Sequence, residues 1–228
     1  MCEVGIKTDF SKLAPIYDFL RTMIFFGALR RSQIDLLNGL PVVENVLILG
    51  GGTGTFLVDM LKGVSVSQID YIDISQGMIT QAKKKVAAAG LFDKVNFICG
   101  SEQDIPEKKY DLICTNYFLD CFSDADLLQL MPLLQERVAD HGHWLFTDFY
   151  LQKQPSFSRK FFLRFLYIFF KVTCHLTVKK LPDFELHFER LDLEKEQESY
   201  FAGKLLRSVL FKKMWNYLYL LSSFINYM

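Results

Sequence analysis

From residue 44 to residue 150 the sequence alternates short runs typical of β-strands with longer runs that have the apolar spacing of helices. The strand-like runs cover residues 44–49, 68–73, 95–99, 110–115 and 143–149. The helical runs between them cover residues 55–62, 75–89 and 123–138, the last bent or restarted at Pro132. Strands that alternate with helices form βαβ units with right-handed crossovers. The sequence therefore predicts an α/β protein with a doubly wound, Rossmann-like, mostly parallel sheet and helices on both faces.

The two ends of the chain have different patterns. Residues 7–40 and 155–190 have the spacing of helices, and the second stretch is rich in Phe. Residues 194–201 and 204–212 have the pattern of strands joined at Ala202-Gly203. A two-residue connection is typical of an antiparallel hairpin, which we expect at one edge of the sheet.

A glycine-rich loop, Gly50-Gly51-Gly52-Thr53-Gly54, directly follows the first strand and precedes a helix. Without a Cβ the backbone can approach a ligand closely, and the helix start offers free N–H groups. The dinucleotide fingerprint needs a third glycine where Thr55 or Leu57 stands, so a nicotinamide-dependent oxidoreductase is disfavoured. The phosphate-binding P-loop also fails, because no Gly-Lys-Ser/Thr follows.

The second predicted strand ends in Asp73. In a doubly wound sheet this carboxylate lies at the carboxyl edge beside the glycine loop, where it can accept both hydroxyls of a ribose. The alternative is that Asp73 caps the following helix. Ser75 is already placed to be that cap, which favours the ribose role.

Four segments in the same order resemble the motifs of class I S-adenosylmethionine-dependent methyltransferases. Residues 46–54 (VLILGGGTG) resemble Val-Leu-Asp-Leu-Gly-Cys-Gly-Thr-Gly, and residues 72–79 resemble the motif around the second-strand acid. Residues 100–106 resemble Gly-Asp-Ala-x-x-Leu-Pro, and residues 110–113 resemble Phe-Asp-Leu-Val. The resemblance covers about half of the chain and implies S-adenosylmethionine as the cofactor.

The resemblance implies a role for each matching position. The glycines would admit the methionine and ribose parts, Asp73 would bind the ribose, and the hydrophobic pair after it would pack on adenine. Residues after the third strand would lie at the adenine edge, and the Asn after the fourth strand would lie near the methyl group. The expected cofactor-binding residues are Tyr17, Gly50, Gly51, Gly52, Gly54, Asp73, Ile74, Met78, Ser101, Glu102 and Asn116.

Tyr17 enters this set through a second resemblance. Residues 13–20 (LAPIYDFL) are similar to the start of the quinone-biosynthesis C-methyltransferases, where an Ala-Pro-x-Tyr-Asp segment covers the cofactor. The alternative is that Tyr17 is a packing residue of an amphipathic helix.

Two positions depart from the family pattern. Ile48 stands where the family often has an acid that reaches the cofactor's amino group or orders its loop. Ser101 replaces a common Asp, so its bond to adenine would lack charge assistance.

Composition limits the partners. The formal net charge is zero, and residues 116–119 (NYFL) lack the catalytic motif of nucleic-acid methyltransferases, so no nucleic-acid partner is expected. The five cysteines form no Cys-x-x-Cys pair and the histidines are scattered, which predicts free thiols and no metal site. The N-terminus has no apolar leader and the apolar stretches are short, so we expect a cytoplasmic protein.

Residues 157–176 form a Phe-rich segment with two interpretations. One is a core-facing helix with solvated charges. The other is a lid for a lipophilic acceptor, or a helix that rests on a membrane surface. We expect a single domain with five parts. Residues 1–40 are an N-terminal helical cap, residues 41–150 the cofactor-binding core and residues 151–190 a helical substrate cover that contains this segment. Residues 191–212 are an edge hairpin and residues 213–228 an apolar tail.

The function predicted from the sequence is methyl transfer to a small, lipophilic or aromatic acceptor. The cofactor supplies the electrophile and the protein positions it. A general base is needed only for an acceptor that loses a proton, and the sequence does not choose among its candidates. These are Tyr17, Tyr117, Asp120, Asp148 and Tyr150. For Asp120 the sequence favours the alternative of a helix-capping or solvated side chain over a proton-transfer role. A regulatory or degenerate protein that binds S-adenosylmethionine without methyl transfer is the alternative, because of Ile48.

Overall fold

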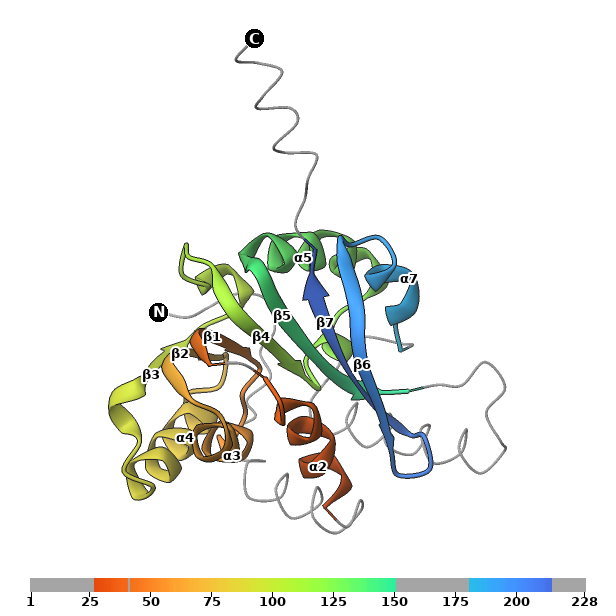
Figure 1. Ribbon diagram of the computed structural model, residues 1–228. Coiled ribbons are helices and arrows are strands. Elements are labelled where there is room, and N and C mark those ends of the chain that lie inside the picture. The colour runs from red at the N-terminus through yellow and green to blue at the C-terminus, as the bar shows by residue number, and fades with distance from the viewer. Residues whose placement is uncertain (1–26, 41, 151–180, 215–228) are drawn as a thin grey trace.

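The structure is a computed structural model that describes residues 27–40, 42–150 and 181–214. Its centre is a seven-stranded sheet with the order β3-β2-β1-β4-β5-β7-β6 (Figure 1). The strands are β1 (Val43–Leu49), β2 (Val66–Asp73), β3 (Val95–Cys99), β4 (Tyr110–Asn116), β5 (Val138–Phe149), β6 (Leu193–Phe201) and β7 (Leu206–Lys213). Strands β1 to β5 pair in parallel, and β7 is antiparallel to both β5 and β6. This confirms the predicted fold class.

Helices cover both faces of the sheet (Figure 1). The α-helices are α2 (Ala28–Ile34), α3 (Thr55–Gly63), α4 (Gln76–Ala88), α5 (Asp124–Arg137) and α7 (Phe184–Phe188). The 3-10 turns are η2 (Asp35–Leu37), η3 (Phe92–Lys94), η4 (Glu102–Asp104) and η5 (Leu119–Cys121). None of the helices that the structure describes is long and apolar enough to cross a membrane.

The helix boundaries follow local capping. Ser123 caps α5 in a capping box with Asp126, which satisfies backbone N–H groups that the first turn leaves free. The helix then runs through Pro132 to Arg137 without the restart that the proline suggested.

Strand β5 begins earlier than the sequence indicated. Val138 pairs with Tyr110, and the next pair is Leu112 with His143, so the register shifts and the intervening residues bulge. The left-handed backbone of His141 belongs to this bulge. The Asp140-His141-Gly142 sequence before the predicted strand therefore marks a bulge inside the observed strand.

The C-terminal hairpin is present, with a longer connection than predicted. Phe201 pairs with Leu206, which leaves residues 202–205 as the loop. Ala202, Gly203 and Lys204 all have positive φ. Of these three residues only Gly203 is of a type that favours positive φ. The sequence therefore indicated a two-residue connection, Ala202-Gly203, and missed the rest of the loop.

Two apolar layers pack on the two faces of the sheet. One contains Ile48, Leu57 and Ile79, and places α3 and α4 against the sheet. The other contains Trp144 and Phe188, and places α5 and α7 on the opposite face. Of the predicted end segments, α2 belongs to the N-terminal cap and α7 to the residues before the hairpin. Tyr17, the Phe-rich segment 157–176 and the tail beyond residue 214 lie outside the described residues.

Candidate functional site

The glycine loop lies between β1 and α3, at the carboxyl edge of the parallel strands. Gly54 is the N-cap of α3, and a Cβ on it would lie 2.7 Å from the Cβ of Ala82, so helix α4 packs directly against the loop. Gly52 differs, because a Cβ there would meet nothing within 4 Å. Its φ of 65° also favours glycine. The middle of the loop therefore faces open space that a ligand can occupy.

Both the N–H and the carbonyl of Gly52 form hydrogen bonds with side chains. Its N–H donates to Oδ2 of Asp73 at 2.8 Å, and its carbonyl accepts from the hydroxyl of Tyr71 at 2.9 Å. Tyr71 is fully buried under the loop. The loop is fixed further along by Lys85 of α4, whose Nζ donates to the hydroxyls of Thr53 and Thr55. Its conformation is thus set by side chains from β2 and α4.

Asp73 joins two loops. Its Oδ1 accepts from the N–H of Ser75 at 2.8 Å while Oδ2 holds Gly52. Burial raises the pKa of Asp73, and these two backbone hydrogen bonds oppose the shift. Ser75 is the cap of α4, as expected, because its hydroxyl accepts from the N–H of Met78. A carboxylate oxygen can accept more than one hydrogen bond, so Asp73 keeps acceptor capacity for a ribose.

The residues expected around adenine lie on two neighbouring turns. Ile74 is 43% exposed, unusually open for a large apolar side chain at this edge, whereas Met78 is buried at the start of α4. Ser101 and Glu102 are partly exposed. The hydroxyl of Ser101 caps η4 by accepting from the N–H of Gln103 at 3.2 Å. Their contact with adenine stays a prediction.

Asn116 ends β4 and is 7% exposed. Within the part of the chain that the structure describes, neither its Oδ1 nor its Nδ2 has a hydrogen-bond partner. A buried amide without partners costs about 1–3 kcal/mol. Leu49 pairs with Thr115, so Gly50 and Asn116 follow on neighbouring strands at the same edge. The unpartnered amide therefore adjoins the glycine loop.

The residue after Asn116 has a strained backbone that the sequence did not reveal. Tyr117 has φ 53°, an uncommon conformation for a bulky residue. Its N–H donates to the carbonyl of Thr147 at 2.7 Å, and its hydroxyl lies 2.7 Å from the hydroxyl of Ser32 in α2. Tyr117 therefore ties the N-terminal helix to the end of β4. Its hydroxyl is engaged in this structural contact.

Two of the other candidate bases, Asp120 and Asp148, lie together at the ends of neighbouring strands. Oδ2 of Asp148 accepts from the backbone N–H of Asp120 at 3.3 Å. Burial raises the pKa of Asp120 to about 6. Burial and the adjacent Asp120 raise the pKa of Asp148 well above its ordinary value. Tyr150 is instead part of another contact, with the Arg207 guanidinium over its ring at 5.4 Å.

Ile48 is 1% exposed and packs in the apolar layer under the glycine loop. It pairs with Tyr71 on the neighbouring strand. The position where the family pattern places an acid is therefore part of the core here, and Tyr71 and Asp73 hold the loop instead.

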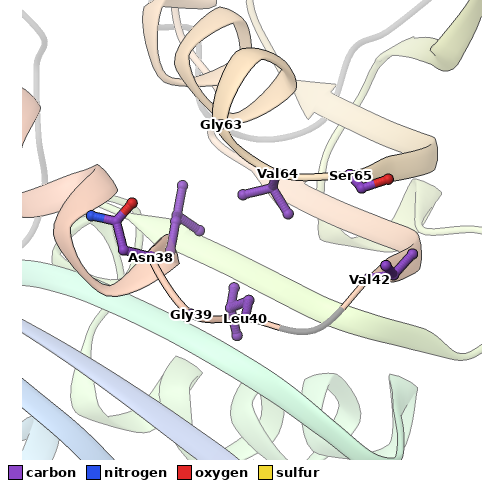
Figure 2. Close-up of a pocket in the computed structure, with 8 residues that line it drawn as sticks. Asn38, Gly39, Leu40, Val42, Gly63, Val64 and Ser65 are labelled. Atoms are coloured by element: carbon purple, nitrogen blue, oxygen red, sulfur yellow. The ribbon is translucent and has the colours of Figure 1, made fainter.

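The pocket in Figure 2 lies elsewhere. It precedes β1 and β2, whose first residues Val43 and Val66 are paired, so it opens at the amino edge of the sheet. Its lining carries no charged side chain: Leu37, Asn38, Gly39, Leu40, Val42, Gly63, Val64 and Ser65. The pocket thus lies at the edge opposite the glycine loop.

Comparison with known proteins agrees with this arrangement. Residues 46–142 match the family model described as a methyltransferase domain. Malonyl-[acyl-carrier protein] O-methyltransferase 2 of Ilyobacter polytropus is 36% identical over 117 residues, covering 49% of this chain and 41% of the relative. Demethylmenaquinone methyltransferase of Bacteroides fragilis is 27% identical over 126 residues, covering 53% of this chain and 51% of the relative. The chain thus spans about half the length of these relatives.

Solved structures show the same fold. The mitomycin 7-O-methyltransferase MmcR superposes with a TM-score of 0.66 at 16% identity, over 90% of this chain and 61% of that one. The N-methyltransferase NodS of Bradyrhizobium japonicum, in complex with S-adenosyl-L-homocysteine, superposes with a TM-score of 0.56 at 13% identity, over 81% and 83%.

Proposed function

Residues 46–142 form a methyltransferase domain of the S-adenosylmethionine-dependent class, and from this premise we propose that the chain transfers a methyl group from S-adenosylmethionine to a small acceptor. The observation that carries the proposal is the amide of Asn116, which has no hydrogen-bond partner in the described part of the chain, beside a fixed glycine loop whose Gly52 faces open space. A buried donor and acceptor without partners is costly unless a ligand satisfies them. The amino and carboxylate groups of the cofactor's methionine part offer such partners.

The cofactor fits the residues present at this edge. Gly52 would admit it, while Gly50, Gly51 and Gly54 let neighbouring side chains pack closely and so shape the loop around it. Asp73 would accept the ribose hydroxyls with its remaining lone pairs. Ile74 offers an exposed apolar surface for adenine, with Met78 behind it and Ser101 and Glu102 at the edge. The proposed contact of Tyr17 rests on the sequence alone.

The bound cofactor supplies a methyl group on a positive sulfur. The chain's own contribution is to hold that group and to exclude water. The hydrogen bonds from Tyr71 and to Asp73 fix the loop before the cofactor arrives, so no ordering cost falls on binding.

We propose a small, lipophilic or aromatic acceptor. The Phe-rich sequence of residues 157–176 supports it as a cover for an apolar molecule or a contact with a membrane surface. The name of the Bacteroides fragilis relative gives demethylmenaquinone, an apolar quinone, as that protein's substrate. The zero net charge gives no attraction to nucleic acid, and the sequence favours a cytoplasmic protein.

The first test is calorimetric titration with S-adenosylmethionine and S-adenosylhomocysteine. We expect saturable binding of both, weakened in Asp73→Asn and unchanged in the matched exposed variant Asp93→Asn. The second test incubates the protein with methyl-labelled cofactor and lipid extracts. Absence of binding would overturn the proposal. Binding without transfer to any extract would favour a protein that binds the cofactor without using it.

A further inference from the structure

Two carboxyl groups, one buried and one partly exposed, lie at the carboxyl edge of β4 and β5. Asp120 is in η5, which follows β4, and Asp148 is near the end of β5. Asp148 is fully buried, whereas Asp120 is partly exposed. One carboxylate oxygen of Asp148 accepts from the N–H of Phe149 at 2.8 Å and the other from the N–H of Asp120 at 3.3 Å. Two backbone N–H groups thus fix the inner carboxyl, and one of them belongs to Asp120 itself.

No cation among the described residues forms an ion pair with either carboxyl. Arg207 stands opposite Asp148 in the β5–β7 register, but its guanidinium bonds Glu185 and Glu198 instead. Among the described residues, the thiol of Cys121 also contacts the pair and donates to Oδ1 of Asp120 at 3.6 Å. Two nearby carboxyls with no paired cation among the described residues cannot both be ionised at low cost. Desolvation raises the pKa of both carboxyls, and the charge of Asp120 raises the pKa of Asp148 further.

An independent observation points to a ligand at this edge. The unpartnered amide of Asn116 lies four residues before Asp120, at the end of the strand that leads into η5. Asn116 is also paired with Thr147, the neighbour of Asp148. Between the amide and Asp120, the ring of Phe118 packs against the glycine loop, 2.7 Å from the place of a Cβ on Gly50. The segment that carries Asp120 therefore borders the proposed cofactor site.

We propose that Asp120 is the general base of the methyl transfer and that Asp148 is its protonated partner. This rests on the proposed function and narrows the acceptor to one that loses a proton when methylated, such as a hydroxyl group or an enolisable carbon. The acceptor's electron pair forms the bond to the methyl carbon. The carbon–sulfur bond breaks and its electrons stay on sulfur, which leaves S-adenosylhomocysteine. The acceptor's proton passes to the carboxylate of Asp120 and later to water.

The geometry distinguishes the two roles. Asp120 is partly exposed, so it can accept a proton from a molecule outside the core. A pKa of about 6 keeps Asp120 mostly ionised at neutral pH while leaving it basic enough to take a proton. Asp148 is enclosed, and burial and the adjacent Asp120 raise its pKa well above the ordinary value, which favours its neutral form. A neutral partner holds Asp120 in place without repelling its charge.

The pair is tested first without an acceptor. Carbon-13 NMR of aspartate-labelled protein, saturated with S-adenosylhomocysteine, follows each side-chain carboxyl against pH. We expect one carboxyl that titrates near pH 6 and disappears in Asp120→Asn, and a second that is still protonated there and disappears in Asp148→Asn. Asp140→Asn, at an exposed position, is the matched control and keeps both signals. Ordinary titration of both carboxyls near pH 4 would overturn the proposal.

Catalysis is tested with three probe acceptors: a naphthol, a demethylated naphthoquinol and a malonyl thioester, whose carboxylate has no proton to lose. For the first two we expect the rate to fall below about pH 6 and Asp120→Asn to lower it about 100-fold or more. Asp140→Asn should leave it unchanged, and Asp120→Asn should keep its cofactor affinity by calorimetry.

An unchanged rate and pH profile in Asp120→Asn would overturn the assignment. Transfer only to the carboxylate oxygen of the malonyl thioester, seen as its methyl ester, or no transfer to any probe by protein that binds the cofactor, would also overturn it. Failure of the wild-type protein to bind the cofactor would contradict the proposed function instead, so the two failures are distinguishable.

Discussion

The hydroxyl of Tyr71 donates to the carbonyl of Gly52 at 2.9 Å, from a side chain that is fully buried beneath the glycine loop. Ile48, where the family pattern often has an acid, pairs with Tyr71 in the neighbouring strand and packs in the core. The loop is thus held from the second strand rather than the first. This arrangement replaces the loop-ordering role of an acid at position 48.

Removing this hydroxyl should weaken cofactor binding. Tyr71→Phe keeps the ring under the loop and deletes one hydrogen bond, worth about 0.5–1.5 kcal/mol. We expect the dissociation constant for S-adenosylmethionine to rise by up to about tenfold in calorimetry. Tyr110→Phe is the matched control, because that buried hydroxyl bonds Asp70, away from the loop. Equal affinities in the wild type and Tyr71→Phe would contradict a role in ordering the loop.

We expect the amide of Asn116 to lower the stability of the cofactor-free protein and to raise its affinity for the cofactor. Asn116→Leu replaces an unpartnered buried amide with an apolar side chain of similar size. We expect an unchanged or higher melting temperature without cofactor, and at least a tenfold loss of affinity for S-adenosylmethionine. Differential scanning fluorimetry and calorimetry measure the two effects. A variant that is destabilised by several kcal/mol and binds normally would show that Asn116 is a structural residue.

The Tyr117–Ser32 contact should couple α2 to the end of β4. Tyr117→Phe removes one hydrogen bond that holds a strained backbone, so we expect the free energy of unfolding to fall by about 1 kcal/mol. Ser32→Ala should give a similar loss, and the double variant should lose less than the sum of the two. Urea unfolding of the four proteins measures this coupling. Strictly additive losses would mean that the two hydroxyls act independently.

The carboxyl pair should make the fold more stable in mild acid. Burial raises the folded-state pKa of Asp120 to about 6 and that of Asp148 further, so the native state binds more protons than the unfolded chain above pH 4. The contribution of the two carboxyls to the free energy of unfolding is fully present below the unfolded-state pKa of about 4. It is lost as the pH rises through their folded-state pKa values. We therefore expect Asp148→Asn to stabilise the protein at pH 7.5 more than at pH 5.

Urea unfolding of the wild type and Asp148→Asn at both pH values measures this difference. Asp140→Asn controls for the general change in net charge. A variant equally stable relative to the wild type at pH 5 and pH 7.5 would show that Asp148 is ordinarily ionised.

Local sequence determined the order of the strands and helices, the glycine loop and the cap of α4. These features depend on neighbouring residues: a backbone position that favours glycine, or a Ser whose hydroxyl reaches an N–H three residues on. The sequence patterns did not predict the local structure where a residue other than glycine adopts a left-handed backbone conformation. The bulge at His141 and the hairpin loop with Ala202 and Lys204 are held by strand pairing, which leaves no local signal.

Only the tertiary structure brought together residues that are distant in the sequence. The bond from Tyr71 to Gly52, the contact of Ser32 with Tyr117 and the burial of Asp120 with Asp148 all join different elements at the carboxyl edge. The sequence named both aspartates as candidate bases without a reason to choose. Burial supplies that reason, because the free energy of a charge depends on the solvent and charges around it, and these are set by the packing of the whole chain.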